Sequence, residues 1–396
     1  MSWKMVKLDD CLELITYGFT NPMPDSEHGP WKVTAKDIAN GRIDFSTARH
    51  TTEEAFTNDL TDKSRPIKDD ILLTKDGTLG RLAIVGEEQI CINQSVALLR
   101  LKKHLLLPRY LLYLLQTPEY QGKMMADAGG STIKHIYITK VNQLLIPVPP
   151  LDKQQQIIDV LFAYDSMIDN CNAQINLLEE AAQRLYKEWF VDLRFPGHEN
   201  TPIVDGVPEG WQKCTLNEIC TVKKDTVTSK QIAPDTPYIG LEHMPRIDFC
   251  LSDWGKAEDV TSNKFRYSED DIIFGKIRPY FHKVGFALNC GVVSTDSFVM
   301  VAKSGLWGLL LMTVFDKAFV EYTYQTCKEG SKMPRADWKQ MEKYPVLIPN
   351  QDILNQFEQY VWTITRKIKM LALQNRALSE ARDRLLPKLM NGEIEV

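Results

Sequence analysis

The sequence predicts an α+β protein that consists of two similar α/β domains, each with a curved antiparallel sheet, and two long helices that pair as a coiled coil. Three observations predict this fold: a repeat of about 200 residues, a heptad-patterned segment at the end of each copy, and short β-rich runs separated by Gly and Asp turns. The chain has 396 residues, 44% of them hydrophobic, which is enough for several domains with cores of their own.

The repeat is recognised from segments that share residue types and occur in the same order in both halves. Matching segments are about 200 to 208 residues apart, so two copies of one structural unit are the economical explanation. The matching segments are residues 3–10 and 211–218, 69–73 and 270–274, 130–133 and 330–333, and 145–149 and 345–349.

Each copy ends in a segment whose apolar residues recur at steps of three and four, the spacing of a coiled-coil seam. Pro149-Pro150 and Pro349 precede these segments, whereas Pro196 and Pro387 lie just beyond them, so the prolines should bound two helices. The predicted seam consists of Ile157, Leu161, Ile168, Ile175, Leu178, Leu185, Phe357, Val361, Ile364, Ile368, Leu371, Asn375, Leu378 and Leu385.

Two interpretations of these apolar stripes are open. Each helix is the partner of the other, which the long and narrow seam favours, or each stripe packs on its own domain. Asn375 is a polar seam residue, which is typical of a device that discourages slipped pairings.

The order of these features divides the chain into five parts. They are a first domain at 1–149, a first helix at 150–190, a linker rich in Pro and Gly at 191–210, a second domain at 211–349 and a second helix at 350–396.

No segment carries a catalytic motif that a DNA enzyme needs. The phosphate-binding loop, the dinucleotide fingerprint, the nucleophile elbow and the Asn-Pro-Pro-Tyr run of adenine methyltransferases are all missing from the sequence. Paired aspartates at 69–70 and 270–271 stand at turns before strands, where solvated carboxylates are common, and the histidines lack ligand spacing. We therefore predict no catalytic residue, no metal site and a role in recognition.

The net charge of −5 means that any surface for DNA must be a local basic face. Loops after the repeated strands offer Gly for close approach, Lys and Arg for phosphates, and amides for base edges. That similar groups recur in both halves favours binding over solvated turns. The predicted DNA-binding residues are Lys75, Thr78, Arg81, Asn93, Gln94, Ser131, Thr132, Lys134, Lys276, Arg278, Tyr280, Ser294, Thr295, Asp296, Ser331, Lys332 and Arg335.

The eight cysteines occur singly, and we expect them to be small buried side chains in a reducing compartment. No run approaches the ~18 apolar residues of a membrane span, and the most apolar one, at 306–312, is typical of a buried helix or strand. The first residues lack the apolar region of a signal peptide, so we expect a cytoplasmic protein without membrane contact.

Four runs of the sequence carry a family resemblance. They are residues 146–154 before the first helix, 185–197 at its end, 270–273 in the second domain, and 385–394 at the end of the second helix. In this order they resemble the specificity subunits of type I restriction–modification systems, over the whole chain. No single run is diagnostic, but the complete order, present in duplicate, is specific.

This resemblance implies a subunit that recognises DNA and catalyses nothing. It implies two target-recognition domains, each of which reads half of a bipartite site in double-stranded DNA, and two helices that pair antiparallel and set the spacer. The implied partners are two methyltransferase (M) subunits, bound by the helices, and two restriction (R) subunits. S-adenosylmethionine, ATP and Mg²⁺ belong to those partners, and no cofactor to this chain.

Two other functions remain open from the residues alone. A self-contained DNA-binding regulator with a coiled-coil spacer would bind its site tightly without partners. A structural scaffold would show no sequence preference. The duplicated loops favour the two DNA-binding functions over the scaffold.

Overall fold

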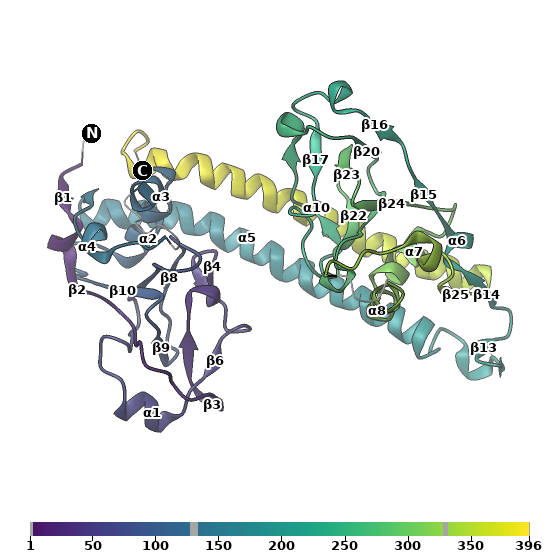
Figure 1. The fold of residues 1–396 in the computed structure, drawn as a ribbon, viewed down its shortest axis with the longest axis horizontal. Coiled ribbons are helices and arrows are strands. Elements are labelled where there is room, and N and C mark those ends of the chain that lie inside the picture. Colours follow the sequence, from purple (N-terminus) through teal and green to yellow (C-terminus); the bar gives the residue numbers. More distant parts are fainter. Residues whose placement is uncertain (1–2, 127–133, 328–331, 396) are drawn as a thin grey trace. The chain divides into compact units, whose positions relative to one another are not determined.

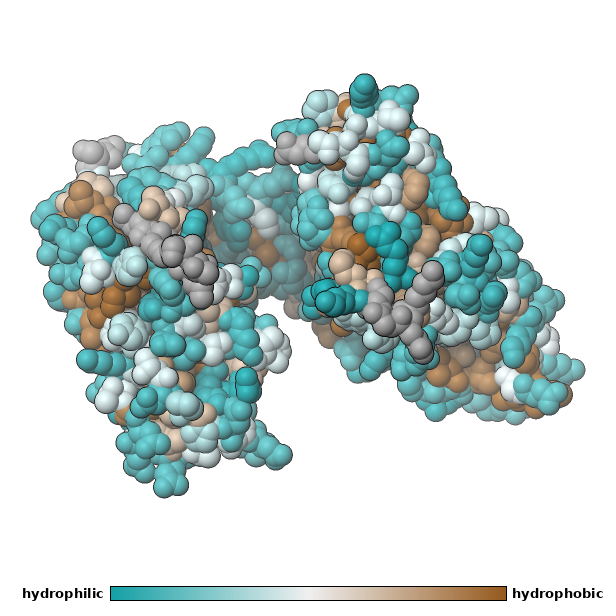
Figure 2. Space-filling model, in the orientation of Figure 1, coloured by the Kyte–Doolittle hydropathy of each residue, from teal (hydrophilic) through white to brown (hydrophobic). Residues whose placement is uncertain are grey.

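A computed structural model describes residues 3–126, 134–327 and 332–395 (Figure 1). The chain forms two compact units: unit 1 contains Met1–Ser166 and Ser379–Val396, and unit 2 contains Met167–Leu378. Side chains on the visible face of each unit are mostly hydrophilic, with apolar ones confined to patches (Figure 2). Within the described ranges, no helix is both long and apolar enough to cross a bilayer.

A four-stranded sheet organises the domain of unit 1. Alternate residues of strand β7 face opposite sides, because Ile71 and Leu73 lie in one core cluster and Leu72 lies in another. The first cluster includes the buried face of helix α2, and the second includes Val33 of a smaller three-stranded sheet. The sheet is therefore covered on both faces.

The strand order of this sheet is β2-β10-β7-β8, that of the smaller sheet is β6-β3-β9, and β1 pairs with β11 and β4 with β5. The strands are β1 Met5–Lys7, β2 Leu12–Tyr17, β3 Ser26–Val33, β4 Ile38–Ala39, β5 Arg42–Ile43, β6 Arg49–His50, β7 Ile71–Thr74, β8 Leu82–Ile84, β9 Ile90–Ile92, β10 Val96–Leu101 and β11 Leu145–Pro147. The short helices are α1 Glu53–Asn58, α2 Pro108–Gln116, α3 Pro118–Ala126 and α4 Ile138–Val141.

The domain of unit 2 repeats this plan with larger sheets. Ile272 and Phe274 of its central strand β21 lie in the cluster that contains helix α7, whereas Ile273 faces a second sheet. The two main sheets have the orders β15-β24-β21-β22-β18 and β16-β20-β23-β17-β19, and β14 pairs with β25.

The strands of unit 2 are β12 Ile203–Val204, β13 Val207–Pro208, β14 Gln212–Thr215, β15 Cys220–Lys223, β16 Thr226–Val227, β17 Pro237–Ile239, β18 Cys250–Leu251, β19 Gly255–Lys256, β20 Lys264–Tyr267, β21 Ile272–Gly275, β22 Val284–Ala287, β23 Gly291–Ser294, β24 Ser297–Ala302 and β25 Pro345–Ile348. Its short helices are α6 Leu216–Ile219, α7 Trp307–Phe315, α8 Lys317–Gln325 and α9 Trp338–Met341.

The fold class predicted from the sequence is confirmed. The order β2-β10-β7-β8 in unit 1 matches β15-β24-β21-β22 in unit 2, and the β1–β11 pair matches β14–β25. Most neighbouring strands are antiparallel, but β3–β9, β17–β23 and β18–β22 are parallel pairs that alternation of residues did not predict. The repeat in the sequence is a repeat of topology.

Two long helices, α5 (Leu151–Tyr186) and α10 (Gln351–Met390), each contribute to both units. In unit 1, Nη1 of Arg382 on α10 lies 2.9 Å from Oδ1 of Asp165 on α5. In unit 2, Asn172 of α5 contacts Asn375 of α10, with Nδ2 of Asn375 2.6 Å from Oδ1 of Asn172. Phe190 follows α5 in the chain, and its ring centroid lies 4.7 Å from that of Phe357, which precedes Asn375 in α10. The helices therefore run antiparallel where they pair.

Both interpretations of the apolar stripes are correct in part. The predicted seam has no exposed residue. Its outer members also belong to the domains, because Leu161 packs in the core of unit 1 and Phe357 in that of unit 2. The fully buried seam residues are Ile157, Leu161, Phe357, Val361, Ile368 and Leu371.

The prediction that Pro387 lies beyond the second helix is wrong. Helix α10 continues through Pro387 to Met390. A proline in the last turn removes one backbone hydrogen bond, whereas Leu386, Leu389 and Met390 bury their side chains in the core of unit 1. Burial of these three side chains outweighs the missing bond.

The segment between α5 and the second domain is ordered. It begins with a π-helical turn, Lys187–Val191, and contains the hairpin β12–β13. The ring of Phe195 is buried and lies 4.7 Å from that of Trp211. Gly and Pro in this stretch therefore mark turns in a packed segment.

The expectation of buried cysteines holds for five of the eight: Cys11, Cys91, Cys171, Cys220 and Cys250. Cys214 and Cys327 are half-buried. The expectation is wrong for Cys290, which is exposed because it lies in the turn between strands β22 and β23.

Candidate nucleic-acid interface

Three of the predicted binding loops of unit 1 meet at Lys75, directly after strand β7. The backbone N–H of Lys75 donates to the carbonyl of Ser95, at 2.9 Å. The carbonyl of Lys75 accepts from the N–H of Ile136, also at 2.9 Å. Loops that are distant in sequence are thus joined by the backbone, without use of the side chains.

The same two hydrogen bonds join the corresponding loops of unit 2. The N–H of Lys276 donates to the carbonyl of Asp296 at 2.8 Å, and the carbonyl of Lys276 accepts from the N–H of Ala336 at 2.8 Å. Lys75 and Lys276 therefore occupy equivalent positions at the ends of strands β7 and β21. Each domain brings three predicted loops into one cluster.

In unit 1, the predicted side chains differ in their freedom. Thr78, Gln94 and Lys134 are exposed, and among the described residues they have no side-chain hydrogen bond. Arg81 donates to the carbonyl of Ile38 at 3.1 Å. Asn93 accepts from the Ser95 hydroxyl at 2.6 Å, which uses its carbonyl oxygen inside the loop. The Lys75 ammonium forms an ion pair with the Asp76 carboxylate at 2.7 Å. Two further predicted residues, Ser131 and Thr132, lie outside the described part of the chain.

In unit 2, several predicted cations are held by the protein. The Lys276 ammonium donates to the carbonyl of Thr295 at 2.7 Å and lies 4.4 Å from the centroid of the Phe298 ring. Burial lowers the pKa of Lys276, with Asp296 opposing that change. Arg335 forms an ion pair with Asp296 at 3.0 Å.

The remaining predicted residues of unit 2 differ in their exposure and in their contacts. Tyr280 and Lys332 are exposed, and the Tyr280 ring packs edge-on against Tyr324. Arg278 is half-buried in a left-handed conformation, with φ of 51°, and Ser294 accepts from the N–H of Asp296. Ser331 lies outside the described residues.

Sequence reasoning missed a group of basic residues in unit 1: Lys32 on β3, Lys36 in the turn after it, and Arg49 on β6. With Asn93 they line a polar hollow of about 210 Å³ beside the 93–95 loop. These residues form no motif in the sequence, because they are brought together only by the pairing of β3 with β6, which places Lys32 opposite Arg49. The sequence offers little signal for this group, because strand β6 consists only of Arg49 and His50.

The paired aspartates have structural partners. Asp70 is buried, accepts two bonds from Arg100, at 2.9 and 2.7 Å, and accepts the N–H of Ile67 at 2.8 Å. Asp271 accepts the N–H of Ser268 at 2.8 Å in the same kind of turn. Among the described residues, no group of three or more His, Cys, Asp or Glu could hold a metal ion.

A protein-family model and several known proteins resemble this chain in sequence. Residues 2–180 match the family model described as the type I restriction modification DNA specificity domain. The type I restriction enzyme MjaIX specificity subunit of Methanocaldococcus jannaschii is 27% identical over 93% of this chain and 87% of its own length. The HindI specificity subunit of Haemophilus influenzae is 26% identical over 74% of this chain and 78% of its own.

The chain is similar to type I restriction–modification specificity subunits, and its role is that of a non-catalytic component that recognises DNA. The solved S subunit of the type I restriction–modification system from M. genitalium shares its fold, with a TM-score of 0.61 and 17% identity over 98% of this chain and 96% of that one.

Proposed function

We propose that each half of this specificity subunit reads one half of a bipartite DNA target, through the segments 1–149 and 211–349. The observation that carries the proposal is the identical backbone linkage of three loops at Lys75 and at Lys276. A duplicated binding surface suits a target with two parts. In this proposal, exposed donors and acceptors such as Gln94 and Thr295 contact base edges, and exposed lysines contact phosphates.

The two helices, in segments 150–190 and 350–396, hold the half-sites at a set spacing and bind the methyltransferase subunits. Polar contacts between the helices support a single register, because a shifted register would separate Asn375 from Asn172. Large apolar side chains are exposed along α10 in unit 2, which is typical of a surface that a partner covers. They are Tyr360, Trp362, Met370 and Leu373.

A specificity subunit works with DNA and with methyltransferase and restriction subunits. The assembly that we propose contains two M and two R subunits for each copy of this chain. S-adenosylmethionine is bound by the M subunits, and ATP and Mg²⁺ by the R subunits, which leaves positioning on DNA as the task of this chain.

The test is methylation of random duplex DNA, read by sequencing. The chain alone, supplied with S-adenosylmethionine, is expected to transfer no methyl group. The chain with its M subunits is expected to methylate adenines at one bipartite sequence. Methyl transfer by the chain alone contradicts the proposal, and tight site-specific binding with no methylation in the presence of M supports a stand-alone regulator instead.

A further inference from the structure

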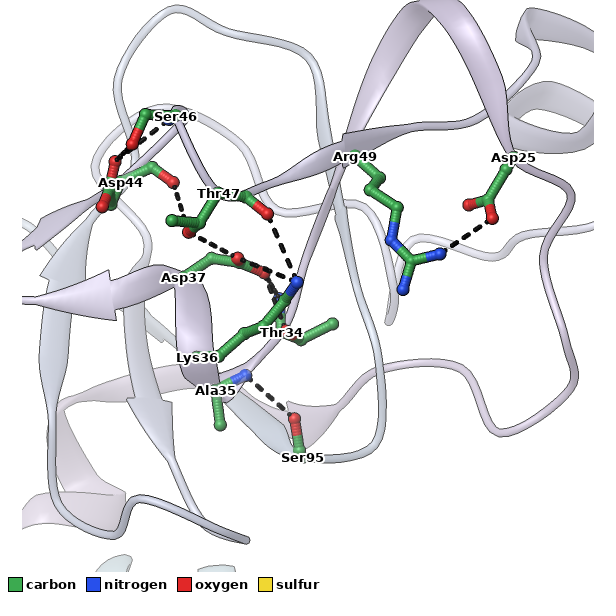
Figure 3. Close-up of polar contacts among 10 residues, drawn as sticks. All are labelled: Asp25, Thr34, Ala35, Lys36, Asp37, Asp44, Ser46, Thr47, Arg49 and Ser95. Atoms are coloured by element: carbon green, nitrogen blue, oxygen red, sulfur yellow. Dashed lines mark hydrogen bonds and ion pairs between the residues drawn. The ribbon is translucent and has the colours of Figure 1, made fainter. Parts of the chain in front are cut away.

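The polar hollow of unit 1 contains three cations from separate elements, and Figure 3 shows two of them, Lys36 and Arg49. Side chains of Lys36 and Arg49 are 58% and 67% exposed, so both can reach a ligand in solution. The hollow adjoins the predicted binding loops, since the Ser95 hydroxyl accepts the N–H of Ala35 at 3.1 Å. A cationic site is thus continuous with the DNA-binding cluster.

Carboxylates beside these cations hold them in place. Asp25 forms ion pairs with both Lys32 and Arg49, and the Arg49 pair is 2.9 Å long. The Lys32 ammonium also donates to the carbonyls of Met23 and Pro24, at 3.2 and 3.1 Å. Lys32 and Asp25 therefore support Arg49, whose guanidinium has further N–H groups to offer.

The second carboxylate, Asp37, is used inside the protein. It is fully buried and accepts the N–H of Thr34 at 2.9 Å and the Thr47 hydroxyl at 2.8 Å. The Lys36 ammonium lies 3.3 Å from the carbonyl of Thr47 and 3.8 Å from Asp37. With three cations and two carboxylates, the hollow has an excess of positive charge and of N–H donors.

Unit 2 has the same backbone at this place but different side chains. The N–H of Asp37 donates to the carbonyl of Thr34, at 3.0 Å, and the N–H of His243 donates to that of Gly240, at 3.1 Å. The His243 ring also accepts the N–H of Gly240 at 2.9 Å, as the Asp37 carboxylate accepts that of Thr34. His243 is therefore the counterpart of Asp37.

This equivalence identifies the counterparts of the three cations. They are Tyr238 for Lys32, Glu242 for Lys36 and Gly255 for Arg49, the last because β19 pairs with β17 as β6 pairs with β3. A Cβ at Gly255 would lie 3.2 Å from the His243 ring, so an arginine has little room there. At these three positions unit 2 has no cation, although it keeps the fold.

We propose that the hollow of unit 1 lined by Lys32, Lys36 and Arg49 binds a backbone phosphate of the DNA, and that the equivalent place in unit 2 binds none. This inference rests on the proposed function of the two halves. The exposed donors of the hollow are the cations Lys36 and Arg49, which suit the anionic oxygens of a phosphodiester, and the exposed carboxylate of Asp25 is already paired with Lys32 and Arg49. The two half-sites are consequently held with unequal electrostatic contributions.

The test uses the full chain in complex with its M subunits and the duplex that the wild-type complex methylates. Affinity is measured at salt concentrations from about 50 to about 200 mM, where each phosphate contact contributes a slope of roughly 0.9. The double variant Lys36→Gln with Arg49→Gln is expected to lower the slope by roughly 1 and to keep the base preference of both half-sites.

Two control variants accompany this measurement. The first control, Lys68→Gln with Lys103→Gln, removes two exposed lysines, of which Lys68 pairs with Glu87 and Lys103 with Asp69. Both lie near the start of β7, whereas the predicted binding loop follows the end of that strand. This control should leave the slope unchanged. Lys36→Arg with Arg49→Lys keeps the charge and should retain most of the slope, which separates loss of charge from loss of folding.

An unchanged slope for the Gln variant, or an equal fall for the Lys68 control, would overturn the phosphate site. A changed base preference at one half-site with an unchanged slope would also overturn it, since the hollow would then read bases. Failure of the wild-type complex to methylate any bipartite sequence is a different result, which contradicts the proposed function itself.

Discussion

Lys75 and Lys276 stand at equivalent positions, and in both the side chain turns back onto the protein. Lys75 pairs with Asp76 and lies 5.3 Å from the Tyr17 ring, whereas Lys276 donates to the carbonyl of Thr295. An ammonium held in this way stiffens the loop and is less free to neutralise a phosphate. At the residue scale, we therefore expect phosphates to be contacted by exposed cations rather than by these two lysines.

Lys276→Ala should lower the free energy of unfolding by about 1 to 2 kcal/mol, because it removes a charge-assisted hydrogen bond. We expect recognition of the second half-site to weaken while the first keeps its base preference. Denaturant unfolding and methylation of a random library measure these effects, with the exposed Lys303→Ala as control. Unchanged stability together with a salt slope lower by a full unit would show that Lys276 is a free phosphate contact.

Gln94 is an exposed amide of the unit 1 cluster, and among the described residues only its backbone has a partner, the carbonyl of Phe19 at 2.8 Å. A free amide can pair bidentately with adenine, an interaction worth about 1 to 3 kcal/mol of discrimination. Gln94→Ala should therefore relax base preference at one position of one half-site and leave the salt slope unchanged. Gln155→Ala, an exposed amide on α5, is the control, and a library profile identical to wild type would exclude Gln94 from base reading.

At the scale of elements, helix α5 is tied to the second domain by a buried acid. Glu179 is only 5% exposed, and its carboxylate accepts the N–H of Phe249 at 2.7 Å. Burial raises the pKa of Glu179 to about 7, with a further upward contribution from Asp248. The protonated form is favoured in the folded protein, so ionisation of this residue opposes the packing of α5 on the domain.

This pKa shift predicts a pH dependence of stability. Between the ordinary pKa of 4.5 and about 7, the folded chain holds more protons than the unfolded chain, so the free energy of unfolding falls as pH rises through this window. Glu179→Gln keeps the acceptor and removes the charge, and should stabilise the protein at about pH 8 by up to about 3 kcal/mol. At about pH 4.5 it should have little effect.

Denaturant unfolding across this pH range checks the prediction. Glu180→Gln is a matched control, because Glu180 is the exposed neighbour and pairs with Arg184 on the helix surface. If Glu179→Gln and wild type lose stability in parallel between about pH 4.5 and 8, Glu179 does not titrate in this window.

At the scale of the whole molecule, the attachment of each helix to its domain decides how spacing can be altered. Gln154, at the start of α5, is fully buried, accepts the N–H of Leu107 at 2.8 Å and donates to the carbonyl of Leu105 at 2.9 Å. Extra residues between Asp152 and Ile157 would displace this anchor. A change of helix length that spares the domains must be made in the middle of both helices.

We therefore expect a seven-residue insertion after Ser166 in α5, matched by seven residues after Leu378 in α10, to lengthen the preferred spacer. Seven residues preserve the heptad seam and add about 10.5 Å of helix, which corresponds to about three base pairs at ~3.4 Å each. Methylation of a library with randomised spacers measures the change. The insertion in α5 alone is the control, since it shifts Asn172 away from Asn375, and an unchanged spacer in a folded double variant would show that the helices do not set it.

The sequence by itself determined the two copies, the central strands, the helices and the apolar seam, because hydrophobic period and the positions of Pro and Gly are local signals. It also located the loops around Lys75 and Lys276, which follow buried strands. Only the tertiary structure decided that these lysines turn inward, that Asn375 meets Asn172, and that Lys32, Lys36 and Arg49 share a hollow. Such contacts depend on strand register and side-chain orientation, which join residues that no spacing along the chain connects.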